Sequence, residues 1–210
     1  MRKLFLTVAS AAMLATACCS QAPESDEEEN PVIETIMARR SIRYYTDTPV
    51  EREKLQKIAE CGINAPNAMN KQEWEVRIVD SKEYLDGATE VMLKAMPFMA
   101  KDKDPKFRNA FRNASAIIAI ACPAEGGSMQ HQNVGLMTEN ICLAAYSLGL
   151  GTCVMGGPAM VLNTCEEAKP WLDKLGFSEG YELQVVIAVG YPDETPEARP
   201  RDASKIKFVD

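Results

Sequence analysis

ASAIIAIA, residues 114–121, is a short run of small, apolar and β-branched residues. A run of this length and composition is typical of a strand that is buried on both faces of a sheet. LQVVIAV, residues 183–189, has the same character and is followed by Gly190-Tyr191-Pro192, a turn sequence that stops a strand. These two runs predict the centre of a β-sheet.

Segments with helical spacing of apolar residues surround the two runs. The longest, residues 129–148, is nearly continuous in small and apolar residues and predicts a central buried helix. The same periodicities predict further helices at residues 31–39, 50–64, 82–96 and 165–175, and a further strand at residues 74–79. Because helices and strands do not alternate in a regular βαβ rhythm, the sequence predicts an α+β fold.

The N-terminus has the features of a bacterial export signal. Arg2 and Lys3 precede an apolar stretch, residues 4–14, that is too short to span a bilayer as a mature helix. Small residues then lead to Cys18, an arrangement that resembles the lipobox of bacterial lipoproteins. We therefore expect a signal peptide over residues 1–17 and lipidation of Cys18. An ordinary secretory signal, or lipidation of Cys19 instead, are the alternatives.

The next segment, residues 18–30, is polar and strongly acidic, which predicts a disordered tether. Its run from Asp26 to Glu29 resembles surface-export signals of some Gram-negative lipoproteins, and a plain solvated linker fits it equally well. Lipid and tether together would hold one domain, residues 31–210, at the cell envelope, on the periplasmic or surface face of the outer membrane. No later segment of the sequence is both apolar and long enough to span a membrane.

The net charge of the chain limits the kinds of partner that it can bind. The chain carries 23 lysines and arginines against 30 aspartates and glutamates, a net charge of −7. Without Arg2, Lys3 and the five acidic residues of the tether, 21 basic and 25 acidic residues remain, a net charge of −4. A mildly acidic domain argues against general nucleic-acid binding. The three arginines within residues 39–43 are therefore a local feature, either a solvated helix end or a site for an anionic ligand.

Cysteine and histidine usage disfavours several kinds of chemistry. Five cysteines lie beyond the tether: Cys61, Cys122, Cys142, Cys153 and Cys165. They are widely spaced and form no C-x-x-C pair, so we expect them to be buried free thiols. With His131 as the single histidine, we expect neither a His-based metal site nor a Ser-His-Asp triad. Any redox chemistry must then come from a cofactor.

Four separated segments carry polar or glycine residues at the edge of an apolar element. They are RRSIR at residues 39–43, APNAMNKQEW at residues 65–74, LGLGTCVMGGP at residues 148–158, and GYP at residues 190–192 with RPR at residues 199–201. Each alone has a plain structural explanation, such as a charged helix end, a turn, a helix-stop glycine or a solvated tail. No G-x-G-x-x-G follows a strand and no P-loop lysine motif occurs, so nucleotide sites of those kinds are not supported.

Together, in this order and spacing, the four segments resemble the FMN-dependent nitroreductase family. The resemblance implies a three-layer α+β fold with a mostly antiparallel central sheet, as an intertwined homodimer with FMN at the interface. It also implies ping-pong electron transfer from NAD(P)H to a small organic acceptor, such as a nitroaromatic or a quinone, without a catalytic side chain. A noncatalytic flavin-binding lipoprotein, a reductive dehalogenase and a flavin reductase are the alternatives. The acceptor and the donor stay open, since NAD(P)H is scarce outside the cytoplasm.

The resemblance also assigns cofactor-binding residues on the arginine-rich segments. Arg39 and Ser41 would hold the phosphate and the ribityl chain, because arginine suits the nearly dianionic phosphate of FMN. Arg43 would lie nearer the flavin pyrimidine, and Arg40 would share the work or face solvent. Arg199 and Arg201 of the C-terminal segment would complete the phosphate site.

The remaining implied contacts come from the two middle segments. Asn70 and Gln72 would meet the edge of the isoalloxazine ring from the partner subunit, on a loop shaped by Pro66, Asn67 and Ala68. Gly156 and Gly157, which follow Met155 at the same site, would let a backbone N–H approach flavin N5. Two departures from the family leave the substrate open: this chain has Glu73 where many relatives have proline, and Val154 near a position where many have an aromatic residue.

Overall fold

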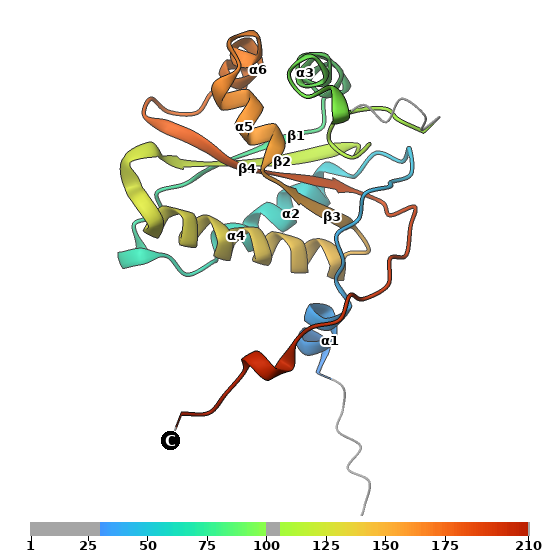
Figure 1. The fold of residues 1–210 in the computed structure, drawn as a ribbon, viewed down its shortest axis with the longest axis vertical. Helices are drawn as coiled ribbons and strands as arrows, with labels where there is room; N and C mark the ends of the chain where they lie inside the picture. Colours follow the sequence, from blue (N-terminus) through green and yellow to red (C-terminus); the bar gives the residue numbers. More distant parts are fainter. Residues whose placement is uncertain (1–29, 100–105, 210) are drawn as a thin grey trace, which may run out of the picture.

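A four-stranded sheet lies between two layers of helices in the computed structural model, which describes residues 30–99 and 106–209 (Figure 1). The strands are β1 (Glu75–Val79), β2 (Ala116–Pro123), β3 (Gly151–Met155) and β4 (Tyr181–Gly190). Their order is β1-β2-β4-β3 and every neighbouring pair is antiparallel. The predicted three-layer α+β fold with an antiparallel sheet is confirmed.

The two apolar runs that predict the sheet's centre form its two inner strands. Residues 117–120 of β2 are fully buried, and Ile118 pairs with Ile187 of β4. A bulge between Ile120 and Ala121 shifts the register of this pair of strands toward their ends. Continuous apolar composition was the correct signal, because both faces of these strands are covered by helices.

Helices cover both faces of the sheet and enclose two separate cores. Above the sheet in Figure 1 lie α3 (Lys82–Ala95), α5 (Gly157–Thr164) and α6 (Lys169–Lys174), and below it lie α2 (Arg52–Ile63) and α4 (Gly127–Ser147). Alternate residues of β4 divide between the two cores. Val186 and Ala188 pack under α3 and α5, whereas Val185 and Ile187 pack against α2 and α4.

The long helix predicted to be buried, α4, is buried on only one face within a single chain. α4 buries one face, with Met137, Ile141 and Ala145 fully enclosed, while Met129 and Leu136 are about half exposed on the other face. Small and apolar residues occur all round this helix, so its composition does not reveal which face meets the sheet.

One strand and one helix were not predicted from the sequence, and one predicted helix has different bounds in the structure. The glycine-rich segment after α4 contains β3, and α5 follows it directly. The helix predicted over residues 165–175 consists of a 3₁₀ turn (Glu166–Ala168) and α6, with Pro170 in the first turn of α6 as expected. β3 is short and rich in small residues, and it is a strand because β4 pairs with it.

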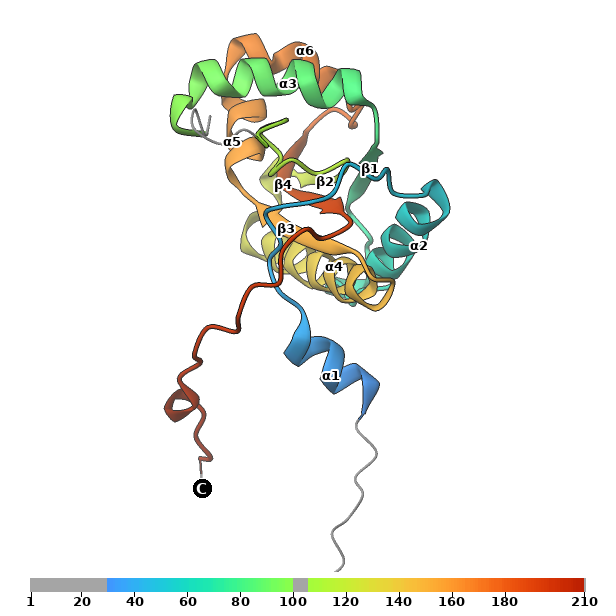
Figure 2. The ribbon, with the colours of Figure 1, turned by 90° about the vertical axis from the view of Figure 1, so that its right-hand side faces the viewer.

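The two ends of the described chain project from the same side of the body (Figure 2). Asn30, the last residue assigned to the tether, caps α1 (Pro31–Ala38), since its Oδ1 accepts the N–H of Val32 at 3.0 Å. α1 buries none of its residues, and Val32 and Met37 are more than 60% exposed. The 3₁₀ turns elsewhere are Ala68–Asn70, Pro97–Met99, Ala124–Gly126 and Ala203–Lys205.

The predicted signal peptide, the lipidated Cys18 and nearly all of the tether lie outside the described residues. Within residues 30–99 and 106–209, no helix is long and apolar enough to cross a membrane.

Candidate functional site

The arginine-rich segment runs along the free edge of β3. Ser41 forms a parallel bridge with Thr152, and the N–H of Ile42 donates to the Thr152 carbonyl at 2.8 Å. Gly151 makes this approach possible, because a Cβ there would lie 2.7 Å from Ile42 Cγ1. This glycine of the third motif therefore serves packing, and it fixes the residues on either side of Ile42 against the sheet.

Tyr45 anchors the other end of the same segment. Its hydroxyl donates to the Ile42 carbonyl at 2.7 Å, and its ring is buried over Gly190, where a Cβ would lie 2.8 Å from Tyr45 Cδ1. Burial raises the pKa of the Tyr45 hydroxyl, which therefore stays a neutral hydrogen-bond donor. The backbone of Tyr45 also pairs with Pro192, so residues 44–46 and 191–193 run side by side.

A first cavity of about 720 Å³ opens beside Arg39 and Arg40. Residues 149–152, the end of α4 at Tyr146, and residues 192–196 complete its walls. Arg39 Nε lies 3.2 Å from Glu139 Oε1 of α4. Arg40 turns back to the end of α1, where Nη1 donates to the Met37 carbonyl at 2.6 Å. The first cavity thus has two guanidinium groups at its edge.

A second cavity, of about 500 Å³, brings Arg43 together with Met155, Gly156 and Gly157. Gly157 is the first residue of α5 and Gly156 its N-cap, with φ −86°. Neither glycine has a positive φ, so the backbone conformation does not require glycine at either position. A Cβ on either would meet nothing within 4 Å. Neither backbone conformation nor packing within this chain explains these two glycines.

The loop that carries Asn67, Asn70 and Gln72 lies at the other end of α4. Asn70 and Gln72 have left-handed backbones, with φ of 51° and 53°, which residues other than glycine rarely adopt. The loop is fixed by side-chain oxygens: Asn67 Oδ1 accepts the N–H of Gln72 at 2.9 Å, and Asn133 Oδ1 of α4 accepts the N–H of Ala68 at 3.2 Å. The side chains of Asn70 and Gln72 are exposed, as is Pro66.

Glu73, the first departure from the family pattern, helps to hold this loop. Gln130 Nε2 donates to its carboxylate at 2.8 Å, and Lys71 Nζ lies 3.8 Å from it. Val154, the second departure, is 47% exposed and lines the second cavity.

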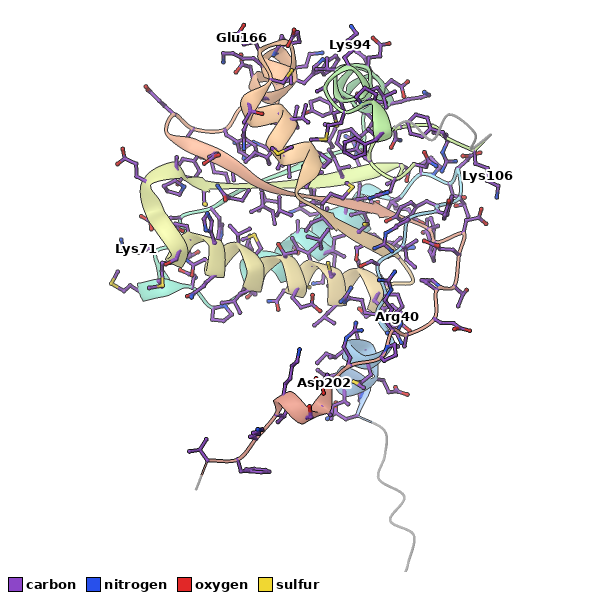
Figure 3. All side chains as sticks on the ribbon, in the orientation of Figure 1. Arg40, Lys71, Lys94, Lys106, Glu166 and Asp202 are labelled. Atoms are coloured by element: carbon purple, nitrogen blue, oxygen red, sulfur yellow. The ribbon has the colours of Figure 1, made fainter. Side chains whose placement is uncertain are left out.

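The structure does not bring the loop and the arginines together within one chain. Figure 3 shows Lys71 of the loop and Arg40 near opposite ends of α4. The loop contacts α4 at Gln130 and Asn133, and the first cavity meets it at Tyr146. At 1.5 Å per residue this spacing corresponds to roughly 20 Å along the helix.

Arg199 and Arg201 lie in the exposed C-terminal segment, away from either cavity wall. Arg201 Nη1 donates to the carbonyls of Arg199, at 2.8 Å, and Pro200, at 3.4 Å. The backbone that leads to them passes the first cavity at residues 192–196.

Two charged residues in these walls were not predicted. The Glu194 carboxylate lies in the first cavity and accepts the backbone N–H groups of Arg43 and of Tyr44. Arg112 lines the second cavity. Glu194 lies 151 residues from Arg43 in the chain, and no local pattern marks either residue.

The cysteines are free thiols throughout the described part of the chain. Cys122, Cys142 and Cys153 are buried as predicted, whereas Cys61 and Cys165 are partly exposed. In the same residues no group of three or more His, Cys, Asp or Glu side chains could hold a metal ion.

Comparison with known proteins identifies the class to which this fold and site belong. Residues 36–191 match the model of the nitroreductase family, so the chain belongs to that family. An NADPH-flavin oxidoreductase of Vibrio harveyi is 28% identical over 186 residues, which cover 82% of this chain and 70% of the relative.

Two solved structures are similar to the whole domain. A nitroreductase with bound FMN from Desulfitobacterium hafniense DCB-2 has a TM-score of 0.77 and 26% identity, and the match covers 86% of this chain and 99% of the other. A nitroreductase with bound FMN from Bacteroides fragilis NCTC 9343 has a TM-score of 0.75 and 25% identity, with 86% and 100% covered.

Proposed function

We propose that this protein is an FMN-dependent oxidoreductase that passes electrons from NAD(P)H to a small organic acceptor, such as a nitroaromatic or a quinone. The observation that carries the proposal is the second cavity, where Arg43 lies with two glycines whose missing side chains leave open space. The relatives support this chemistry, since two are nitroreductases with bound FMN and one is an NADPH-flavin oxidoreductase.

The donor set of the first cavity fits the phosphate end of FMN. Arg39 and Arg40 offer planar guanidinium groups, which suit bidentate binding of a phosphate. We propose that Arg39 exchanges its ion pair with Glu139 for the phosphate, and that Ser41 donates a hydroxyl beside it. Arg199 and Arg201 would join them if residues 197–201 folded toward the cavity that residues 192–196 already border.

FMN, when bound, supplies a ring that accepts hydride at N5 and then gives up electrons, so donor and acceptor use one pocket in turn. The residues of the second cavity would bind and orient that ring. A backbone N–H of Gly156 or Gly157 would reach N5 through space that a side chain would fill. Arg43 would place a positive charge beside the pyrimidine, where reduction builds negative charge. We assign no catalytic acid or base.

The experiment that tests the function is direct. The purified protein is expected to be yellow, with a flavin spectrum, and anaerobic mixing with NADH or NADPH should bleach it. A colourless protein that does not take up FMN contradicts the cofactor. A yellow protein that neither dinucleotide bleaches contradicts NAD(P)H as donor and favours the noncatalytic flavin-binding alternative.

We propose further that the protein is a homodimer, with the loop of residues 66–72 completing the site of the partner subunit. Within one chain, roughly 20 Å of α4 separates the contacts of this loop from the end of the helix that borders the first cavity. A two-fold axis near the middle of α4 would remove that separation. The outer face of α4 supports such an axis, since the half-exposed Met129 and Leu136 and the partly exposed Leu143 recur on it at every seventh residue. The exposed apolar side chains of α1 would pack against the same partner.

Leu136→Arg is expected to dissociate this dimer, because two like charges would then lie at the centre of an apolar interface. Light scattering should show the mass of a monomer, and FMN should be lost with the partner's loop. Glu166→Arg, which changes an exposed residue on the opposite side of the sheet from α4, is the control and should leave the dimer intact. A wild-type monomer that still holds FMN would contradict the proposed assembly.

The N-terminal sequence supports a location at the cell envelope. We propose that residues 1–17 are a signal peptide, that Cys18 is lipidated, and that residues 18–30 tether the domain to the periplasmic or surface face of the outer membrane. Radiolabelled palmitate should label the wild type and not Cys18→Ala. Equal labelling of the two proteins would refute lipidation at this residue.

A further inference from the structure

Residues 108–114 form a rigid loop built around two buried asparagines. Asn109 and Asn113 are each 6% exposed. Asn109 Oδ1 accepts the N–H groups of Phe111 and Asn113, at 3.0 and 3.1 Å, and its Nδ2 donates to the Ala114 carbonyl at 3.0 Å. In return Asn113 Oδ1 accepts the N–H groups of Arg108 and Asn109, at 2.7 and 3.2 Å. The two amides thus fix the loop's backbone in place.

This loop holds Arg112 in a left-handed backbone conformation. Its φ is 61°, followed by 67° at Asn113. Asparagine tolerates this region, whereas arginine has no local hydrogen bond to compensate for the steric cost. A glycine would fit the loop better, and yet an arginine occupies the position. Its side chain is exposed and lines the second cavity.

Arg112 also differs in its partners from the arginines that hold the fold together. Three of those form ion pairs: Arg52 with Asp80, Arg77 with Glu75, and Arg108 with Asp47. Within residues 30–99 and 106–209, no carboxylate pairs with Arg112. Burial raises the pKa of the nearby Cys153 thiol, and the positive charges of Arg43 and Arg112 partly offset that rise. A cation that has no counter-ion among the described residues is suited to an anion from outside the chain.

The walls of the second cavity indicate what kind of anion would fit. No aspartate or glutamate of the described residues lines it, and Arg43 adds a second positive charge. Phe98, Phe107 and Met160 contribute apolar surface on which a flat ring can stack. Since the proposed function assigns Arg43 to the flavin, Arg112 is the cation left for a second ligand.

We propose that Arg112 selects for electron acceptors that carry an anionic group, such as a carboxylate, on an aromatic ring. The guanidinium would bind the carboxylate while the ring lies against the apolar wall. This inference rests on the proposed function, because it names the class of acceptor that the flavin pocket takes. Neutral nitroaromatics or quinones would still enter, but without the charge-assisted hydrogen bonds.

Equilibrium binding of a redox-inert pair tests this without turnover. Benzoate and the neutral benzamide have the same ring, and calorimetry on the FMN-loaded protein should show tighter binding of benzoate. Arg112→Gly should weaken benzoate about tenfold or more and leave benzamide within about twofold, because hydrogen bonds to charged groups contribute on that scale. Arg112→Lys keeps the charge and should retain part of the preference.

The variant and its controls separate this role from a structural one. Arg112→Gly suits the left-handed backbone, so its melting temperature should not fall. Arg52→Gln, which removes an exposed arginine on α2, should leave benzoate binding unchanged. With 4-nitrobenzoate and nitrobenzene as acceptors, Arg112→Gly should raise the KM of the first alone.

Three results would overturn the proposal. Equal affinity of benzoate and benzamide in the wild type would show that the cavity has no preference for an anion. Loss of FMN from Arg112→Gly would assign the residue to the cofactor cradle. A tenfold rise in the KM for NAD(P)H, with benzoate binding unchanged, would assign it to the phosphates of the donor. A protein that binds no FMN at all instead refutes the proposed function, and the comparison of benzoate with benzamide can still be made on it.

Discussion

Gly157→Val is expected to yield a folded protein that no longer retains FMN. The valine side chain would enter the open space of the second cavity, where the flavin is proposed to lie against the backbone. Filling an occupied space costs about 1–3 kcal/mol, so FMN affinity should fall about tenfold to hundredfold. Because Gly157 has no positive φ, the apoprotein should be at least as stable as the wild type. Fluorescence titration with FMN and a thermal melt measure both quantities.

Gly180→Val is the matched control for this substitution. Gly180 has φ +80° in the turn before β4, so valine should lower the melting temperature and leave FMN affinity unchanged. If Gly157→Val behaved in the same way, with normal flavin binding and lost stability, Gly157 would be a turn residue and the proposed contact with N5 would be wrong.

Arg39→Ala is expected to have the largest effect on cofactor affinity. The phosphate of FMN would lose its charged partner, and truncating one member of such a pair costs about 2–5 kcal/mol, at least about thirtyfold in Kd. The side chain of Arg39 lies at the edge of the first cavity and is 26% exposed, so its loss should leave both cores intact. Titration of the apoprotein with FMN measures the change.

Two further variants serve as controls for the effect of Arg39→Ala on FMN affinity. Arg52→Ala removes an arginine whose side chain is 82% exposed and which binds Asp80, and it should leave FMN affinity unchanged. Glu139→Gln removes the carboxylate that competes with the phosphate for Arg39, so FMN should bind at least as tightly as to the wild type. Unchanged affinity in Arg39→Ala would refute the placement of the phosphate.

The sequence by itself determined the class of fold. Continuous apolar runs such as residues 117–120 predict strands covered on both faces, and that prediction needs no knowledge of their neighbours. Helices with polar stretches at their ends, such as α2 and α3, were also placed within a few residues. These signals are local, because they depend on the burial of each segment against something apolar, whatever that partner is.

Only the tertiary structure decided which charged and glycine residues share a cavity. Arg43 and Gly157 line the same cavity although 114 positions separate them in the chain. Arg112 lines it too, from a loop whose left-handed backbone no sequence pattern predicts. The loop of Asn70 and Gln72 has the composition of a cofactor-binding segment, yet it lies at the far end of α4 from Arg40 (Figure 3). Such contacts are set by how the layers pack and by which strand pairs with which. A local pattern reports what a residue can bind, and the packing of distant segments decides what it lies beside.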